Sequence, residues 1–100
     1  MKITLKRTDH KYIVTINGFS RILDTLKEAF TIIANTRYVD TKLEILYDMR
    51  ILPKGKRKRE VVRQWLLSYP TEISIDNAVH DIIVGNHTLT DALKRKGFVQ

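Results

Sequence analysis

The sequence predicts a single α+β domain in which a three-stranded antiparallel sheet packs on one helix and three to four short helices follow. Apolar and polar residues alternate through the first 23 residues, as in half-buried strands, and apolar residues then recur at helical spacing. The 100 residues, 43% of them hydrophobic, are enough for one core and too few for two ordinary domains. We therefore expect residues 1–36 to form a β-β-β-α unit and residues 37–100 to be a mainly helical part of the same core.

Three strands are expected before residue 24. Asn17-Gly18 predicts a two-residue type I′ hairpin turn, because both residues tolerate positive φ, and residues 19–23 then pair back on the preceding strand. The apolar face of this hairpin has three cross-strand pairs: Ile16 with Phe19, Val14 with Arg21 and Tyr12 with Leu23. The other face carries Lys2, Lys6, Lys11, Thr15 and Ser20. We interpret that second face as solvated or covered rather than as a reader of nucleic acid.

A helix is expected to begin after Thr25, because Thr25-Leu26-Lys27-Glu28 has the spacing of a capping box. Apolar residues then fall at i, i+3, i+4 and i+7, which places them on one face of the helix: Leu26, Ala29, Phe30 and Ile33. This stripe would lie on the apolar face of the sheet. We expect the helix to end near Asn35.

Residues 42–52 carry two conflicting patterns. Every second residue from Leu43 to Ile51 is apolar, which is typical of a strand. Thr41-Lys42-Leu43-Glu44, however, repeats the capping-box spacing of a helix start. We favour a helix for this segment, with a strand as the open alternative.

Three helices are expected in the rest of the chain. The first runs from Lys56 to Tyr69 and stops at Pro70, with an apolar stripe made of Val61, Val62, Trp65 and Leu66. This spacing assigns Trp65 to the core rather than to a base-stacking role. The second is capped by Ser74 or Asp76 and runs through Val84 to Gly85.

The last helix is short. Thr88 with Asp91 caps it, and it carries Ala92 and Leu93 and ends at Gly97.

A run of basic residues at the start of the predicted 56–69 helix is the strongest functional signal. Cations at a helix N-terminus oppose the helix dipole at a cost of roughly 0.3–1 kcal/mol each, so this position is poor for stability alone. A concentrated positive field suits phosphate contacts, in which Lys and Arg release counterions. The residues predicted to bind nucleic acid or an acidic partner are Lys54, Lys56, Arg57, Lys58, Arg59 and Arg63.

Lys94, Arg95 and Lys96 form a secondary basic patch at the end of the last predicted helix. The helix dipole favours cations at that end, so a structural role is sufficient to explain them. They extend the first patch only if the two helices are neighbours.

The expected β-β-β-α order is similar, in topology alone, to the small DNA-binding domains of the AP2 and integrase-arm kind. In those domains a three-stranded sheet backed by one helix enters the major groove. The similarity covers roughly the first 36 residues, rests on no specific motif and implies no site residue in this chain.

These features indicate a small, non-enzymatic protein that binds DNA or RNA, or regulates its partners, through phosphate contacts of a basic helix. The alternative is an inhibitor or adaptor encoded by a virus or mobile element, which docks its basic helix on an acidic or nucleic-acid-binding surface of a host protein. Either protein would act as a monomer or a homodimer.

No catalytic, cofactor or metal site is expected. Cysteine is absent, and His10, His80 and His87 are scattered without a third metal ligand at supporting spacing. The longest apolar runs are far shorter than the roughly 20 residues of a membrane span, and no signal peptide is apparent. We expect a cytoplasmic protein, or a nuclear one in a eukaryotic host, because residues 53–59 fit a short nuclear-localisation signal.

Overall fold

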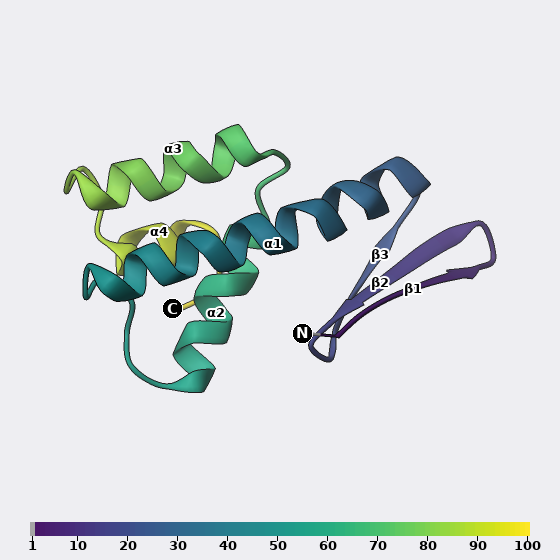
Figure 1. Ribbon diagram of the computed structural model, residues 1–100, viewed down its shortest axis with the longest axis horizontal. Coiled ribbons are helices and arrows are strands. Elements are labelled where there is room, and N and C mark those ends of the chain that lie inside the picture. Colours follow the sequence, from purple (N-terminus) through teal and green to yellow (C-terminus); the bar gives the residue numbers. More distant parts are fainter. Residues whose placement is uncertain (1) are drawn as a thin grey trace.

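The computed structural model describes residues 2–100 as a three-stranded antiparallel sheet followed by four helices (Figure 1). The predicted α+β class and the predicted strand order are confirmed. The strands are β1 (Ile3–Thr8), β2 (Lys11–Ile16) and β3 (Phe19–Leu23). The helices are α1 (Leu26–Asp48), α2 (Lys56–Leu67), α3 (Glu72–Ile83) and α4 (Leu89–Arg95).

The β2–β3 hairpin has the predicted register. Asn17 and Gly18 both have positive φ, at 49° and 85°, as a type I′ turn requires. The pairs on one face are those expected from the turn: Ile16 with Phe19, Val14 with Arg21 and Tyr12 with Leu23. Val14 and Ile16 are buried on this face, whereas Phe19, next to the turn, is 48% exposed.

α1 is one continuous helix of 23 residues, so the expected end near Asn35 is wrong. No Gly or Pro occurs between Leu26 and Asp48 to stop it. The favoured helix for residues 42–52 is correct as far as Asp48, but it continues α1 instead of starting anew. Thr41 does not cap a helix; its hydroxyl donates to the carbonyl of Arg37 at 3.3 Å.

The buried stripe of α1 has one polar member, Thr36, and a second buried polar residue, Asn35, lies next to the stripe. The members of the stripe recur at alternating steps of three and four residues: Ala29, Ile32, Thr36, Val39, Leu43 and Leu46. The Thr36 hydroxyl donates to the carbonyl of Ile32 at 2.8 Å, which satisfies it inside the core. The neighbouring Asn35 side chain donates to the carbonyl of Pro70 at 3.4 Å. Asn35 and Thr36 are therefore accommodated in the middle of α1 and do not end it.

The expected sheet-facing stripe of this helix is correct only in part. Ala29 is buried and Ile33 packs partly against the core, but Leu26 and Phe30 face outward, with Phe30 56% exposed. Because Ile32 takes the buried position, the packed face is rotated away from the predicted one.

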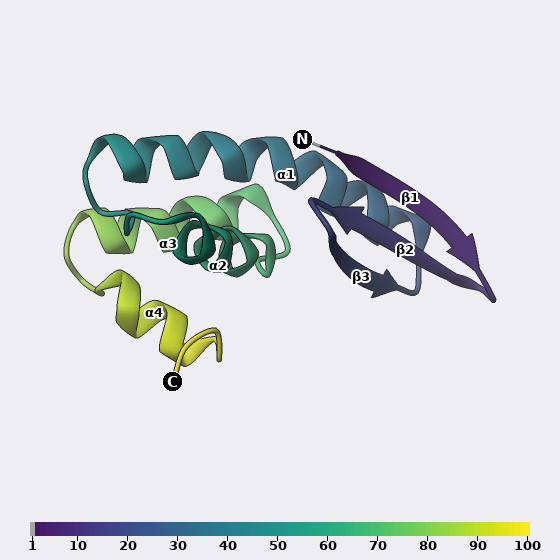
Figure 2. The same ribbon diagram turned by 90° about the horizontal axis from the view of Figure 1, so that it is seen from below.

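α1 connects the two parts of the molecule. Its first turns lie beside the sheet, and its C-terminal part runs beside α3 and crosses α2 (Figure 2). The Asp9-His10 turn is at the far end of the sheet, whereas the Asn17-Gly18 turn lies toward α2 (Figure 1). The Arg21 guanidinium donates to the carbonyl of Leu67 at 2.9 Å, which ties β3 to the end of α2.

The remaining helices differ from expectation mainly at their ends. α2 ends at Leu67, before Tyr69, and α3 begins earlier than predicted because Thr71, not Ser74 or Asp76, caps it. The Thr71 hydroxyl accepts from the backbone N–H of Ser74 at 3.2 Å. The predicted Thr88 cap of α4 is confirmed, since its hydroxyl accepts from the Asp91 N–H at 3.1 Å.

Trp65 lies in the core, as predicted, with 0% of its surface exposed. Its ring meets that of Tyr69 edge-on, with 5.7 Å between the centroids. Of the helices in residues 2–100, none combines the length and the apolar character needed to cross a membrane.

A polar contact joins α1 to α3 outside this core. The Lys42 ammonium lies 2.8 Å from the Asp76 carboxylate, and the Tyr38 hydroxyl also donates to it. Both hydrogen bonds, that of Lys42 first, hold the pKa of Asp76 below its ordinary value of 3.8. The Asp76 carboxylate therefore favours the folded state when it is ionised.

We predict that Leu46→Ala lowers the free energy of unfolding by about 2–5 kcal/mol, whereas Ile45→Ala lowers it by less than about 1 kcal/mol. In the helix Leu46 is fully buried and Ile45 lies at the surface. Urea denaturation of both variants measures the difference. Comparable losses in the two variants would contradict the helical assignment, because a strand would bury Ile45 beside Leu43.

We predict that Asp76→Asn lowers stability near neutral pH and that its deficit relative to the native protein shrinks as pH falls. Folding lowers the pKa of Asp76, so its contribution is present above pH 3.8 and is lost as pH falls through the folded-state pKa. Urea denaturation over a series of acidic pH values measures this convergence. Asp48→Asn is the control. It removes a carboxylate from the last residue of α1, where a negative charge opposes the helix dipole, so it should not lower stability near neutral pH. A deficit that does not depend on pH would contradict the ionic role of Asp76.

Candidate nucleic-acid interface

The N-terminus of α2 is formed without a side-chain cap. Gly55 is the N-cap residue, with φ of 114° and ψ of 137°, and its carbonyl accepts from the N–H of Arg59 at 3.0 Å. Because glycine has no side chain, no cap hydrogen bond satisfies the first N–H groups of the helix. The next three residues are Lys56, Arg57 and Lys58, so the uncapped first turn of the helix also carries three exposed cations.

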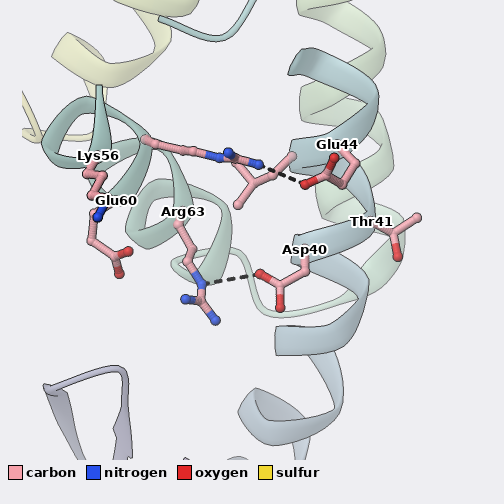
Figure 3. A pocket seen from close by; sticks show the side chains of 8 residues that line it. Asp40, Thr41, Glu44, Lys56, Glu60 and Arg63 are labelled. Atoms are coloured by element: carbon pink, nitrogen blue, oxygen red, sulfur yellow. Dashed lines mark hydrogen bonds and ion pairs between the residues drawn. The ribbon is translucent and has the colours of Figure 1, made fainter. Parts of the chain in front are cut away.

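The six predicted binding residues fall into two groups. Four of them are exposed and have no ion pair within residues 2–100: Lys54, Lys56, Arg57 and Lys58. We call these four residues the basic turn. The other two contact α1: Arg59 pairs with Glu44, and Arg63 extends from α2 toward Asp40 (Figure 3).

Arg59 and Arg63 form ion pairs between the two helices. Arg59 Nη2 lies 2.8 Å from Glu44 Oε1, and Arg63 Nε lies 3.4 Å from Asp40 Oδ1 (Figure 3). Asp40 and Glu44 are one turn apart on α1, and Arg59 and Arg63 are one turn apart on α2. The earlier residue on each helix pairs with the later residue on the other, so the two helices run in opposing directions at this contact. Arg59 also lies over the ring of Tyr47, at 5.2 Å from its centroid.

These contacts give Arg63 a structural role. Its side chain is only 7% exposed, so its charge is directed into the contact between α1 and α2 and not toward a surface partner. Arg59 is 41% exposed and combines its ion pair with a position beside the basic turn. A cleft of about 540 Å³ lies between the two helices at this point, and Lys56 and Glu60 also line it. Both signs of charge line the cleft, so a simple anion site is not formed there.

The secondary patch is divided in the same way. Lys94 of α4 and Lys58 of α2 line one hollow of about 460 Å³, so the two basic segments are neighbours there. Lys96 lies over the ring of Tyr69, at 4.3 Å from its centroid, and Arg95 lines a different hollow beside that ring. Of the three residues, Lys94 is the one that adjoins the basic turn.

A larger hollow lies on the other side of the basic turn, between the β2–β3 hairpin and α2. Its volume is about 710 Å³, and its lining is mainly apolar. We call it the Phe19 groove; its lining includes Asn17, Phe19, Arg57, Val61, Gln64 and Phe98. The sequence did not indicate Phe19 as a site residue, because its pairing with Ile16 across the hairpin assigns it to the sheet face that packs on the core. Its position at the start of β3, next to the turn, leaves it half uncovered.

Residues 2–100 contain no group of three or more acidic or His residues placed to hold a metal ion. Asp76, which stands one turn before His80, is engaged with Lys42 and Tyr38 instead.

Comparison of this chain with protein-family models, with curated proteins and with solved structures gives no significant match. Inferences about its function therefore rest on the geometry and charge of its own residues.

We predict that Arg63→Met lowers the free energy of unfolding by about 1–3 kcal/mol, because it removes a largely buried charge-assisted contact and leaves Asp40 without that cation. Lys58→Met is the control, since it likewise replaces a cation of α2 by methionine, at an exposed position five residues away, and should not lower the free energy of unfolding by more than about 0.5 kcal/mol. Denaturant unfolding of both variants provides the comparison. Equal stability of the two variants would show that Arg63 has no structural role.

Proposed function

We propose that this protein is a non-catalytic nucleic-acid-binding protein that contacts the phosphate backbone through the basic turn. The observation that carries the proposal is the grouping of four exposed cations, without internal ion pairs among the described residues, around the uncapped start of α2. Each of these cations opposes the helix dipole, and their mutual repulsion adds to the cost. A bound phosphate would offset both effects.

The backbone N–H groups support the same interpretation. At an uncapped N-terminus they are free to donate to an anionic oxygen, and the helix dipole favours a negative charge there. Lys56, Arg57 and Lys58 surround this position with side chains that also donate to phosphate. The N–H groups and cations at this site are therefore better satisfied when an anion is bound than in the free protein.

Lys94 makes the positive surface larger than a single bound phosphate would need. It belongs to α4 and shares a hollow with Lys58 of α2, so cations from two helices lie along one surface. Successive phosphates of a polymer need such an extended row of cations, whereas a single bound anion does not. This arrangement favours DNA or RNA over a small anionic ligand.

We predict that the triple variant Lys56→Gln, Arg57→Gln, Lys58→Gln weakens nucleic-acid binding and flattens its dependence on salt. Each phosphate contact contributes about 0.9 to the slope of log K against log salt for duplex DNA and about 0.7 for a single strand, so the slope should decrease by about 2 to 3. Fluorescence anisotropy with labelled duplex DNA, single-stranded DNA and RNA at several salt concentrations measures both quantities.

The matched control is Lys2→Gln, Lys6→Gln, Lys27→Gln, which removes three exposed cations from β1, its N-terminal flank and the start of α1. It changes the net charge by the same amount and should leave the salt slope nearly unchanged. Equal losses in the two triple variants would show that binding depends on net charge and not on the basic turn. If the native protein binds none of the three polymers at low salt, the nucleic-acid proposal is wrong, and an acidic protein surface becomes the partner to test.

A further inference from the structure

We infer that the Phe19 groove holds an unstacked base of a single-stranded nucleic acid while the basic turn contacts the adjoining phosphates. This inference rests on the proposed function and specifies its substrate class. It predicts that the protein prefers single strands to duplexes.

The groove brings aromatic and aliphatic groups from three distant segments to one surface. Phe19 comes from the start of β3, Val61 from α2, and Phe98 from the C-terminal segment after α4. Phe19 is 48% exposed, so a flat ligand has direct access to it. At about 710 Å³, the groove lies within the range of roughly 300–1,000 Å³ that is typical of sites for small ligands and ample for one base.

Cations stand at the edge of this apolar surface. Lys56 and Arg57 line the groove and are also members of the basic turn, so the aromatic surface and the phosphate contacts share two residues. Proteins that bind single strands combine these same elements, a positively charged path for the backbone and aromatic rings on which bases stack. The arginine side chain can also stack on a base through its planar guanidinium group.

Polar groups in the groove match the edge of a base. Asn17 and Gln64 each carry an amide that can donate and accept hydrogen bonds. Glu60 also lines the groove, and its carboxylate accepts from the Gln64 amide at 3.3 Å. This carboxylate repels phosphate, so a phosphate is expected nearer Arg57 than Glu60, with the uncharged base on the aromatic side.

The protein should distinguish single strands from duplexes by whether the flat face of a base is accessible. In a duplex each base is covered above and below by its neighbours, so Phe19 has no π-face to contact. The basic turn, in contrast, meets phosphates in either form. A duplex should therefore bind through charge alone, and a single strand through charge and stacking together.

The test compares labelled oligo(dT) with a duplex of the same length by fluorescence anisotropy, at one low salt concentration and over a salt series. We expect the native protein to bind oligo(dT) more tightly. Phe19→Ala should weaken oligo(dT) binding about 5- to 100-fold, leave the duplex affinity unchanged and leave the salt slope unchanged, because no phosphate contact is removed. Phe30→Ala, which removes an exposed ring from α1 outside the groove, should change neither affinity.

Two further substitutions separate stacking from a structural effect. Phe19→Trp keeps an aromatic face and should retain oligo(dT) binding, with indole fluorescence quenched when the base stacks. Phe19→Leu keeps an apolar side chain without that face and should behave like Phe19→Ala. Unfolding curves of all four variants verify that each is folded at the assay temperature.

The outcomes distinguish this inference from the proposed function. If Phe19→Ala binds oligo(dT) as tightly as the native protein does, while the Lys56, Arg57 and Lys58 triple variant binds weakly, the base-binding groove is wrong and the phosphate-binding function stands. The next ligand to test in the groove would then be an apolar segment of a protein partner. If the native protein binds no nucleic acid, both proposals are wrong.

Discussion

The continuous buried stripe of α1 is the feature on which the rest of the structure depends. By its length, the helix spans about 34 Å, and the molecule measures 43 Å along its longest axis, so one helix supports nearly the whole length of the protein. Its first buried residues pack beside the sheet, and its later ones pack among α2 and α3. Without a straight, uninterrupted helix, the sheet and the helical part would share little apolar surface, and the Phe19 groove between them would not form.

The polar residues in and beside that stripe explain where sequence-based prediction succeeded and failed. The hairpin could be predicted because Asn17-Gly18 sets a register through local backbone geometry alone. The length of α1 could not, because the polar residues Asn35 and Thr36 resemble a helix end until the hydrogen-bond partner of each is known. Thr36 bonds within its own helix, but Asn35 reaches Pro70, which is distant in sequence. A capping motif at Thr41 was similarly ambiguous, since the same hydroxyl can bond back to the preceding turn.

The surface proposed for binding shows a comparable division. Composition and position were sufficient to select the basic run at the start of α2, because the charges there conflict with the helix dipole whatever the tertiary fold. The separation of Arg63 from the exposed lysines could not be read from the sequence, since it depends on Asp40 facing it from another helix. The proximity of Lys94 to Lys58 and the exposure of Phe19 also arise from packing between segments far apart in the chain.

The uncapped start of α2 makes folding depend on the ionic strength, and under the proposed function it would make binding depend on the ionic strength in the opposite direction. Mobile ions screen the repulsion among the cations of the basic turn and their conflict with the dipole, so raising the ionic strength should make the free protein more stable. If the basic turn binds phosphates as proposed, the same ions would compete for its cations and would weaken that complex. A bound polyanion would stabilise the native state by mass action, and this stabilisation would be largest at low salt, where the free protein is least stable. The thermal melting temperature of such a complex would therefore respond to two ionic effects of opposite sign, which partly cancel. Added salt should lower that melting temperature less than the loss of binding alone would.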